Sequence, residues 1–192
     1  MIKTTSLVMR ACITTWVMTT AATVAGHESQ PPRLRSDNRR IQEVIRFALE
    51  RSESFQDVVA TLDLFDRIVY VEEGECFERE HRSCVHLMPN SRNLIVHIDP
   101  RQPIQRAAAA LAHELYHAVE IGRAPEVVDR QSLEALYEQL GDQSCRAQLH
   151  HTCWETSGAQ AFEALVMRQL TNGKVKWSYS GLGAPRPIGG PE

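Results

Sequence analysis

Two histidines and a glutamate stand at a spacing that can hold and use a metal ion. Residues 113–117 read His-Glu-Leu-Tyr-His, which has the pattern HExxH. On a helix, residues four apart lie about 40° apart around the axis, so His113 and His117 share a face and can bind one zinc ion. Glu114 lies about 100° from His113, beside the metal, where it can take a proton from water that zinc activates. The alternative is a chance pair of exposed histidines on an ordinary amphipathic helix.

The apolar residues of this predicted helix, roughly residues 101–121, lie opposite the two histidines on a helical wheel. We expect the apolar side to face the core and the histidine side to stay free for a metal. The apolar residues are Ile104, Ala108, Leu111, Leu115, Ala118 and Val119.

A catalytic zinc ion needs a third protein ligand and an open position. The downstream candidates are Glu155, Glu163, His150 and His151. In a helix predicted over Trp154–Leu170, Glu155 shares a stripe with apolar residues and points inward, where a buried carboxylate needs a partner such as zinc. We expect Glu155 as the third ligand and Glu163 as a hydrogen-bond partner of a ligand histidine. Glu163 and the His150/His151 pair remain alternative third ligands. Glu155 could instead have no metal role and stabilise the helix N-terminus through the helix dipole.

A hydrolase also needs a donor that stabilises negative charge on the reacting carbonyl oxygen. Tyr116, Tyr179 and His97 are candidates, and the sequence prefers none of them. His86 and His97 lie in predicted strands. Apart from the possible donor role of His97, we interpret both as structural or exposed residues.

Two helices and three strands are predicted ahead of the HExxH helix. Apolar residues recur at helical spacing from Ile41 to Leu49 and again from Ser54 to Leu64. Three short runs read as strands, namely Arg67–Glu72, Cys84–Met88 and Asn93–Asp99. We therefore expect an α+β fold, in which a small antiparallel or mixed sheet of about three strands packs with the HExxH helix and several further helices.

Residues that favour helix ends mark the remaining helices. Asp99 suits the N-cap and Pro103 the first turn of the HExxH helix, and Gly122 would close it. A short helix is expected at Ser132–Leu140, with Ser132 as its N-cap.

The first residues, Met1–Ala25, are typical of an export signal. Lys3 and Arg10 precede an uncharged run of about 15 residues, shorter than the roughly 20 that span a bilayer. An uncleaved membrane anchor is the alternative. The predicted organisation is a signal peptide (1–25), a flexible lead (26–40), a single catalytic domain (41–172) and a Gly/Pro-rich tail (173–192).

The charge of the mature chain argues against a nucleic-acid partner. Without Lys3 and Arg10, 19 basic residues remain against 24 acidic ones, a formal charge of −5. A nucleic-acid-binding protein needs a basic stripe, which this sequence lacks. We expect no nucleic-acid partner and no stable membrane insertion after the signal is cleaved.

Four cysteines remain after Cys12 leaves with the signal. They form two pairs whose partners are eight positions apart, which favours the local disulfides Cys76–Cys84 and Cys145–Cys153 among the three possible connectivities. A zinc site built from these cysteines is the competing interpretation. Neither pair has the short CxxC-like spacing that such sites favour.

The HExxH helix followed by a glutamate on a second helix resembles the gluzincin branch of the zincin metallopeptidases, over roughly residues 93–170. The resemblance implies zinc-dependent cleavage of peptide or protein substrates. It also implies a strand at the sheet edge just before the HExxH helix, for which Asn93–Asp99 would fit, and such an edge can hold an extended peptide.

The chain departs from zincin patterns in three places. Glu120 and Arg123 stand where the extended HExxHxxGxxH pattern requires glycine and histidine. The 38-residue interval from His117 to Glu155 is longer than in the thermolysin-like arrangement, and Ala159 stands where that pattern often has aspartate. The resemblance therefore supports zinc hydrolysis more strongly than any particular substrate.

Together these features predict a secreted or periplasmic zinc metallopeptidase with Glu114 as general base and with His113, His117 and Glu155 as metal ligands. A zinc-stabilised binding or structural module without catalysis is the first alternative. A disulfide-bonded structural protein with an accidental HExxH pattern is the second. Glu114 favours an enzyme, because a purely structural zinc site has no need of this carboxylate.

Overall fold

The chain folds as an α+β protein. The computed structural model describes residues 32–74, 76, 83–89, 91–141 and 155–172. The strands and helices within them are β1 (Leu34–Arg35), α1 (Arg39–Arg51), α2 (Glu53–Leu62), β2 (Val69–Glu73), β3 (Ser83–Leu87), β4 (Leu94–Ile98), α3 (Ile104–Gly122), α4 (Arg130–Leu140) and α6 (Ser157–Asn172). The predicted signal and tail, Cys145, Cys153, His150, His151 and Tyr179 lie outside the described residues. No helix in the described part of the chain is long and apolar enough to cross a membrane.

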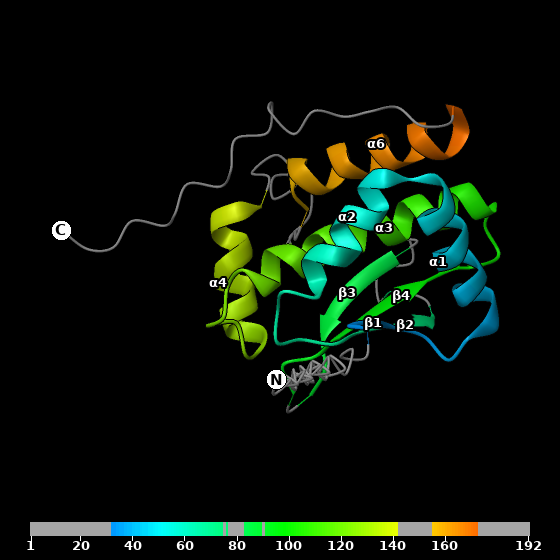
Figure 1. Cartoon of the computed structure of the whole chain (residues 1–192). Helices are drawn as coiled ribbons and strands as arrows, with labels where there is room; N and C mark the ends of the chain where they lie inside the picture. Colours follow the sequence, from blue (N-terminus) through cyan, green and yellow to red (C-terminus); the bar gives the residue numbers. More distant parts are fainter. Residues whose placement is uncertain (1–31, 75, 77–82, 90, 142–154, 173–192) are drawn as a thin grey trace, which may run out of the picture. The chain divides into compact units, whose positions relative to one another are not determined.

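The sheet is mixed and has the strand order β1-β2-β4-β3 (Figure 1). β1 pairs with β2 and β2 pairs with β4 in parallel, whereas β3 runs antiparallel to β4. Our expectation that Asn93–Asp99 forms the sheet edge was wrong, since β4 is paired on both sides. Leu94, Val96 and Ile98 of β4 are fully buried, which suits an interior strand. Ser83–Leu87 takes the edge position instead.

Residues 32–40, which belong to the segment 26–40 that we predicted to be a flexible lead, contain a strand and the start of a helix. Leu34 is buried and pairs with Val69 of β2. The Asn38 side chain accepts hydrogen bonds from two N–H groups of the first turn of α1 and so fixes where this helix begins. The prediction was wrong for residues 32–40, because a strand of two residues leaves no periodicity in the sequence.

α1 and α2 meet at Ser52, which ends one helix and caps the next. Its hydroxyl accepts a hydrogen bond from the backbone N–H of Phe55 at 3.0 Å. Gln169 of α6 donates to the Ser54 hydroxyl at 3.0 Å, which ties the start of α2 to α6. The buried apolar residues of the two helices are Ile41, Val44, Ala48, Phe55, Val58 and Leu62.

α3 is the central element, in contact with α1, α2, α6, β3 and β4 (Figure 1). Six consecutive residues, Ala107–Ala112, are buried, so the helix is covered on every side over this stretch. Our expectation of one core face and one free face was therefore wrong. The small side chains let neighbouring elements approach from all directions, and the histidine side is covered by α6 and the residues just before it.

α3 begins later than predicted, and it ends at Gly122, the residue that was predicted to close it. Asp99 does not cap the helix. Its carboxylate accepts hydrogen bonds from the backbone N–H and from Nε of Arg101, at 2.9 and 2.8 Å, and α3 begins at Ile104. Gly122 is the last helical residue, and a Cβ there would lie 2.5 Å from the ring of Phe65. Glycine is thus needed at this position for close packing.

α4 and α6 also begin elsewhere than predicted. Asp129 caps α4, and its side chain accepts a hydrogen bond from the backbone N–H of Ser132 at 2.8 Å. Ser132, the predicted N-cap, lies three residues further on. Its hydroxyl oxygen accepts a hydrogen bond from the backbone N–H of Asp129, which completes a capping box. α6 begins at Ser157 rather than Trp154, because the Thr156 hydroxyl accepts from the N–H of Ala159 at 3.1 Å in the manner of an N-cap.

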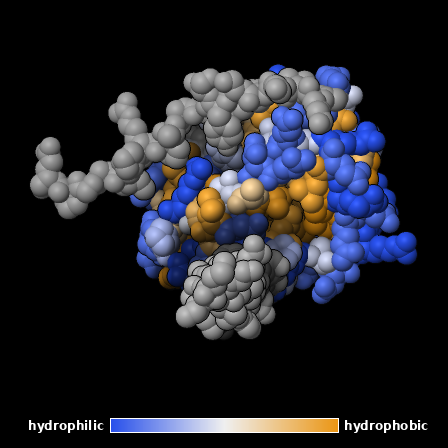
Figure 2. Space-filling model, in the orientation of Figure 1, coloured by the Kyte–Doolittle hydropathy of each residue, from blue (hydrophilic) through white to orange (hydrophobic). Residues whose placement is uncertain are grey.

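The surface on the α1 side is mostly hydrophilic, and hydrophobic residues show in patches between hydrophilic ones (Figure 2). Exposed ion pairs four residues apart join Arg39 to Glu43 and Arg46 to Glu50 along α1. Such exposed pairs contribute little to the free energy of folding. These charged side chains lie on the solvent-exposed face of α1, and the apolar face of the helix packs toward α3.

Candidate metal centre

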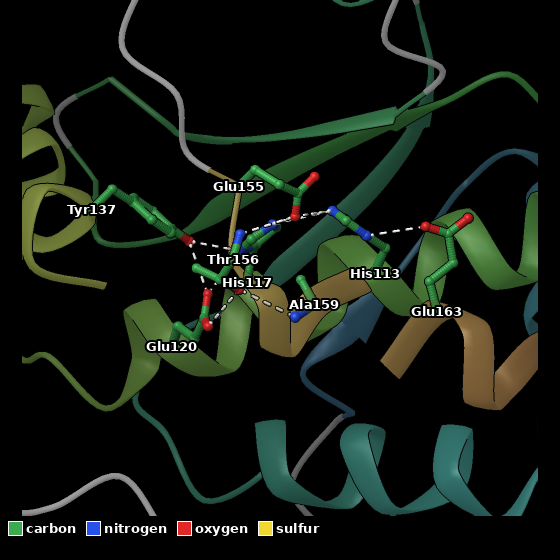
Figure 3. A network of polar contacts seen from close by, with 8 residues as sticks. All are labelled: His113, His117, Glu120, Tyr137, Glu155, Thr156, Ala159 and Glu163. Atoms are coloured by element: carbon green, nitrogen blue, oxygen red, sulfur yellow. Dashed lines mark hydrogen bonds and ion pairs between the residues drawn. The ribbon is translucent and has the colours of Figure 1, made fainter. Parts of the chain in front are cut away.

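His113 and His117 lie on α3 with their rings turned toward Glu155 (Figure 3). Their Nε2 atoms are 3.2 Å apart. Oε1 of Glu155 lies 3.4 Å from Nε2 of His113 and 3.9 Å from Nε2 of His117. Both histidines are buried, and the Glu155 side chain is 26% exposed. Three potential ligand atoms from two parts of the chain thus converge, and of the three residues only Glu155 is partly exposed.

The three atoms are spaced much as ligands of a tetrahedral metal ion are. Zinc bonds of about 2.0–2.1 Å leave neighbouring ligand atoms about 3.3 Å apart in a tetrahedron. Two of the three observed distances match this spacing, and the one from His117 to Glu155 is longer. Lone pairs from two neutral imidazoles and a carboxylate repel one another at these distances unless a proton or a cation lies between them. Two imidazoles and one carboxylate are a donor set that suits zinc.

The outer nitrogen of His117 is held by a small hydrogen-bond network. Nδ1 of His117 lies 2.8 Å from Oε2 of Glu120. The carboxylate acts as acceptor, so Nδ1 carries the ring proton and Nε2 presents its lone pair to the site. Thr156 donates to the other Glu120 oxygen at 2.9 Å, and the Tyr137 hydroxyl lies 3.2 Å from Nδ1. Residues from α3, α4 and the start of α6 therefore fix this ring (Figure 3).

Glu163 of α6 lies at the outer nitrogen of His113. Its Oε2 is 3.2 Å from Nδ1, but the ring N–H does not point straight at the oxygen, so this is a close polar contact rather than a well-formed hydrogen bond. The Glu163 side chain is 43% exposed and can turn to improve the angle. The structure thus places Glu163 behind His113, at the position expected for a partner of a ligand, and away from the three inward atoms.

Glu155 reaches the histidines from just before α6. We expected it on the first turn of a helix beginning at Trp154, and this part of the prediction was wrong. The backbone N–H of Thr156 donates to Oε1 of Glu155 at 2.9 Å, and this oxygen is the one that faces the histidines. The Thr156 side chain also donates to Glu120 and caps α6. Thr156 therefore links Glu155 to α6 and to the carboxylate that contacts His117.

Glu114 is buried on α3, and the Ser83 hydroxyl of β3 donates a hydrogen bond to it. Burial raises the pKa of the Glu114 carboxyl. The nearby His117 and His113 and the Ser83 hydrogen bond lower the pKa in part, while the Glu155 charge raises it. The net shift is upward, toward the range in which a carboxylate accepts a proton more readily.

The carboxylates give the site a field that favours positive charge. Burial alone would lower the pKa of His113, but Glu163, Glu114 and Glu155 more than offset it, and the net pKa is raised. Burial, together with the charges of Glu120 and Glu114, raises the pKa of Tyr137 well above its usual value, so its hydroxyl stays protonated. A cation at this position would be stabilised by the same carboxylates.

Four site residues were not singled out from the sequence as site residues. Glu120 follows His117 by three residues on a helix, a spacing that places side chains together and could have indicated it. Ser83, Tyr137 and Thr156 come from other elements, and no local pattern marks them. Their positions depend on how β3, α4 and α6 pack against α3.

Of the candidate oxyanion donors, the structure describes Tyr116 and His97. The Tyr116 ring packs on Phe162, with centroids 5.3 Å apart, and over Gly158 in the α3–α6 contact. His97 lies on the other face of the sheet, with its ring centroid 5.8 Å from that of His86. Burial and the nearby His97 lower the pKa of His86.

Cys76 and Cys84 form the first of the two expected disulfides. Cys84 also belongs to a second cluster of potential ligands with His86 and His97. This cluster is separate from the one on α3. The second expected disulfide lies outside the described residues.

No protein-family model, curated protein or solved structure matches this chain. A functional argument therefore depends on the chemistry of the site itself. That chemistry consists of three converging ligand atoms, carboxylates behind both histidines, and a buried carboxylate on the same helix.

Proposed function

We propose that the protein is a zinc-dependent hydrolase of the zincin type, and specifically a metallopeptidase. The observation that supports this most strongly is the convergence of two imidazole nitrogens and a carboxylate oxygen beside the buried Glu114. His113, His117 and Glu155 would hold the zinc. When bound, zinc supplies a Lewis acid that acidifies water and polarises a carbonyl group.

Glu114 acts in this proposal as the general base. Its raised pKa suits a group that takes a proton from the attacking water and passes it to the leaving amine. The Ser83 hydrogen bond favours the charged form of the carboxylate and lowers its pKa in part. Glu120 and Glu163 orient the histidine rings through their outer nitrogens, which keeps both inner nitrogens available as ligands.

The edge strand β3 supports a peptide as the substrate. Among the described residues, β3 pairs with β4 on one side only, so its other edge presents free backbone groups. Ser83, at one end of β3, is the residue that bonds Glu114. An extended peptide added to this edge would therefore run toward the base and the metal ligands.

Export of the chain is part of the same proposal. The Cys76–Cys84 disulfide supports a secreted or periplasmic location, because disulfides form and persist in oxidising compartments. It is consistent with the export signal expected at residues 1–25.

Glu114→Gln tests the proposed role of the base. The amide keeps the size of the side chain but cannot accept the proton, so hydrolysis of a quenched fluorescent peptide library should fall by about 10²–10⁴-fold. Zinc content should not change, because Glu114 is not a ligand in the proposal. Glu72→Gln, the same change at an exposed position on β2, is the matched control and should keep full activity.

Two results would contradict the proposal. Full activity in Glu114→Gln would remove Glu114 from the chemistry. A wild-type protein that binds zinc but cleaves no peptide in the library would favour a zinc-stabilised binding module instead.

A further inference from the structure

A second group of potential metal ligands lies on the face of the sheet opposite α3. Val85 and Val96 are buried and face α3, and the residues that alternate with them, Cys84, His86 and His97, face the other way. The sulfur and the ring nitrogens of these three residues all lie within 4.8 Å of one another. These three side chains are only partly buried, whereas Cys76, which is bonded to Cys84, is buried.

We propose that reduction of the Cys76–Cys84 disulfide turns this group into a second metal site, with two cysteine and two histidine ligands, for zinc or a similar thiol-binding divalent cation. In the disulfide form, the two sulfur atoms share a bond and are poor ligands. As thiolates they are strong ligands, and two thiolates with two imidazoles form a common zinc donor set. The same four residues would then hold either a disulfide or a metal ion.

The strand register places three of the four residues, and the disulfide places the fourth. Cys84 and His97 are directly opposite in the β3–β4 pair, and His86 lies two residues along on the same face. Nε2 of His86 is 3.2 Å from Sγ of Cys84. The Cys76 sulfur lies next to this group, because it is bonded to the Cys84 sulfur in the oxidised form.

Gly74 helps to place the His97 ring. A Cβ at this position would lie 2.9 Å from Cγ of His97, too close for the ring to stay where it is. Gly74 is also fixed by a backbone hydrogen bond to the carbonyl of Ile98 at 3.2 Å. The ring is therefore confined on the Gly74 side and kept near the cysteine sulfur.

The reaction needs a reductant and a metal ion. A dithiol gives two electrons to the Cys76–Cys84 bond and closes into its own disulfide, and its two protons pass to the two cysteine sulfurs. A divalent cation then binds both sulfurs and displaces these two protons into solvent. The two cysteine sulfurs would thus be joined by a disulfide in one redox state and by a metal ion in the other.

The test compares zinc bound to the oxidised and the reduced protein. A Cys145→Ser/Cys153→Ser variant removes the other expected cysteine pair from the comparison. The protein is reduced anaerobically with a phosphine, dialysed against limiting free zinc, and its zinc per chain is measured beside the oxidised sample. We expect one additional zinc per chain after reduction. Cobalt in place of zinc should give a thiolate charge-transfer band in the reduced sample alone.

Two variants assign the additional metal. His97→Asn should lose the additional zinc on reduction, whereas His113→Ala/His117→Ala should keep the gain, because these histidines lie on α3. Equal zinc in the oxidised and reduced protein, with no cobalt–thiolate band, would overturn the proposal. An additional zinc that binds His86→Asn and His97→Asn as tightly as the parent would also overturn it. The comparison of redox states uses one sequence, so it does not depend on how a histidine variant folds, and it is independent of whether the α3 site is catalytic.

Discussion

At the scale of single residues, the histidines of the candidate site depend on the groups behind them. Glu120 lies 2.8 Å from the outer nitrogen of His117 and is itself held by Thr156 and near Tyr137. Glu163 lies at the equivalent nitrogen of His113, but it is more exposed and less well aligned. The two carboxylates should therefore contribute unequally to metal binding.

Glu120→Gln should lower zinc affinity by about 10–100-fold, the usual effect of losing a hydrogen-bonded partner of a ligand histidine. The glutamine amide keeps the shape of the Glu120 side chain but removes the negative charge that holds the His117 ring proton on Nδ1. Competition with a coloured chelator measures the affinity. Glu138→Gln, at an exposed position on α4, is the control. Equal affinity of Glu120→Gln and the wild type would show that this carboxylate does not support the ligand.

Ser83→Ala should move the acidic limb of the pH–activity profile to higher pH. The Ser83 hydrogen bond stabilises the charged form of Glu114 and lowers its pKa, so removing it raises that pKa further. Since the base acts in its charged form, activity at acidic pH should fall more than activity at alkaline pH. The measurement is kcat/KM across the pH range. An acidic limb that stays in place or moves to lower pH would contradict the assignment.

At the scale of elements, the site depends on how closely α6 packs against α3. A Cβ on Gly158 would lie 2.8 Å from the Tyr116 ring, so glycine at the start of α6 lets the two helices approach. Glu155 stands just before this point. A change in the α3–α6 spacing should therefore move Glu155 away from the histidines.

Gly158→Ala should reduce both stability and zinc affinity. Overpacking of a close contact costs about 1–3 kcal/mol in the free energy of unfolding. Gly122→Ala is a matched control, because a Cβ there meets Phe65 at 2.5 Å, whereas a Cβ at Gly158 meets Tyr116 in the α3–α6 contact. It should lose stability with little change in zinc affinity. Urea denaturation and chelator competition separate the two effects, and equal zinc affinity in both variants would contradict the argument.

Local patterns predicted the parts of this arrangement that lie within one element. The four-residue spacing placed His113 and His117 on one face of a helix, and the eight-residue spacing of Cys76 and Cys84 indicated a disulfide, which the structure contains. Glu155 was expected near the histidines by a helical-wheel argument that proved wrong, because α6 begins two residues after it. Its position follows from the Thr156 cap, which a wheel does not show.

Features that depend on pairing between distant segments could not be predicted. The sequence favours a strand at residues 93–99, but its periodicity does not say whether that strand is interior or at the edge. β1 is too short to produce a pattern, and the contact of Ser83 with Glu114 exists only because β3 pairs with β4 beside α3.

At the scale of the whole molecule, a bound metal would link elements that are far apart in sequence. His113 and His117 come from α3, and Glu155 comes from the segment that begins α6. Because the three ligand atoms converge only in the folded chain, metal binding should stabilise that state selectively.

Removing the metal should therefore lower the stability of the protein. Free zinc at 100 times its Kd stabilises the folded state by about 2.7 kcal/mol. We expect the urea midpoint to fall when a chelator is added and to recover when zinc is restored. The His113→Ala/His117→Ala variant should be insensitive to the chelator. A wild-type midpoint that ignores both chelator and zinc would mean that the site does not bind metal in the folded chain.

The zinc content of the purified, oxidised protein tests the central claim most directly. Elemental mass spectrometry of the wild type is compared with Glu155→Ala and with Glu163→Ala, the matched loss of a neighbouring carboxylate. The account predicts one zinc per chain in the wild type and in Glu163→Ala, and loss of zinc in Glu155→Ala. No zinc in the wild type, even after reconstitution with the metal, would contradict the account.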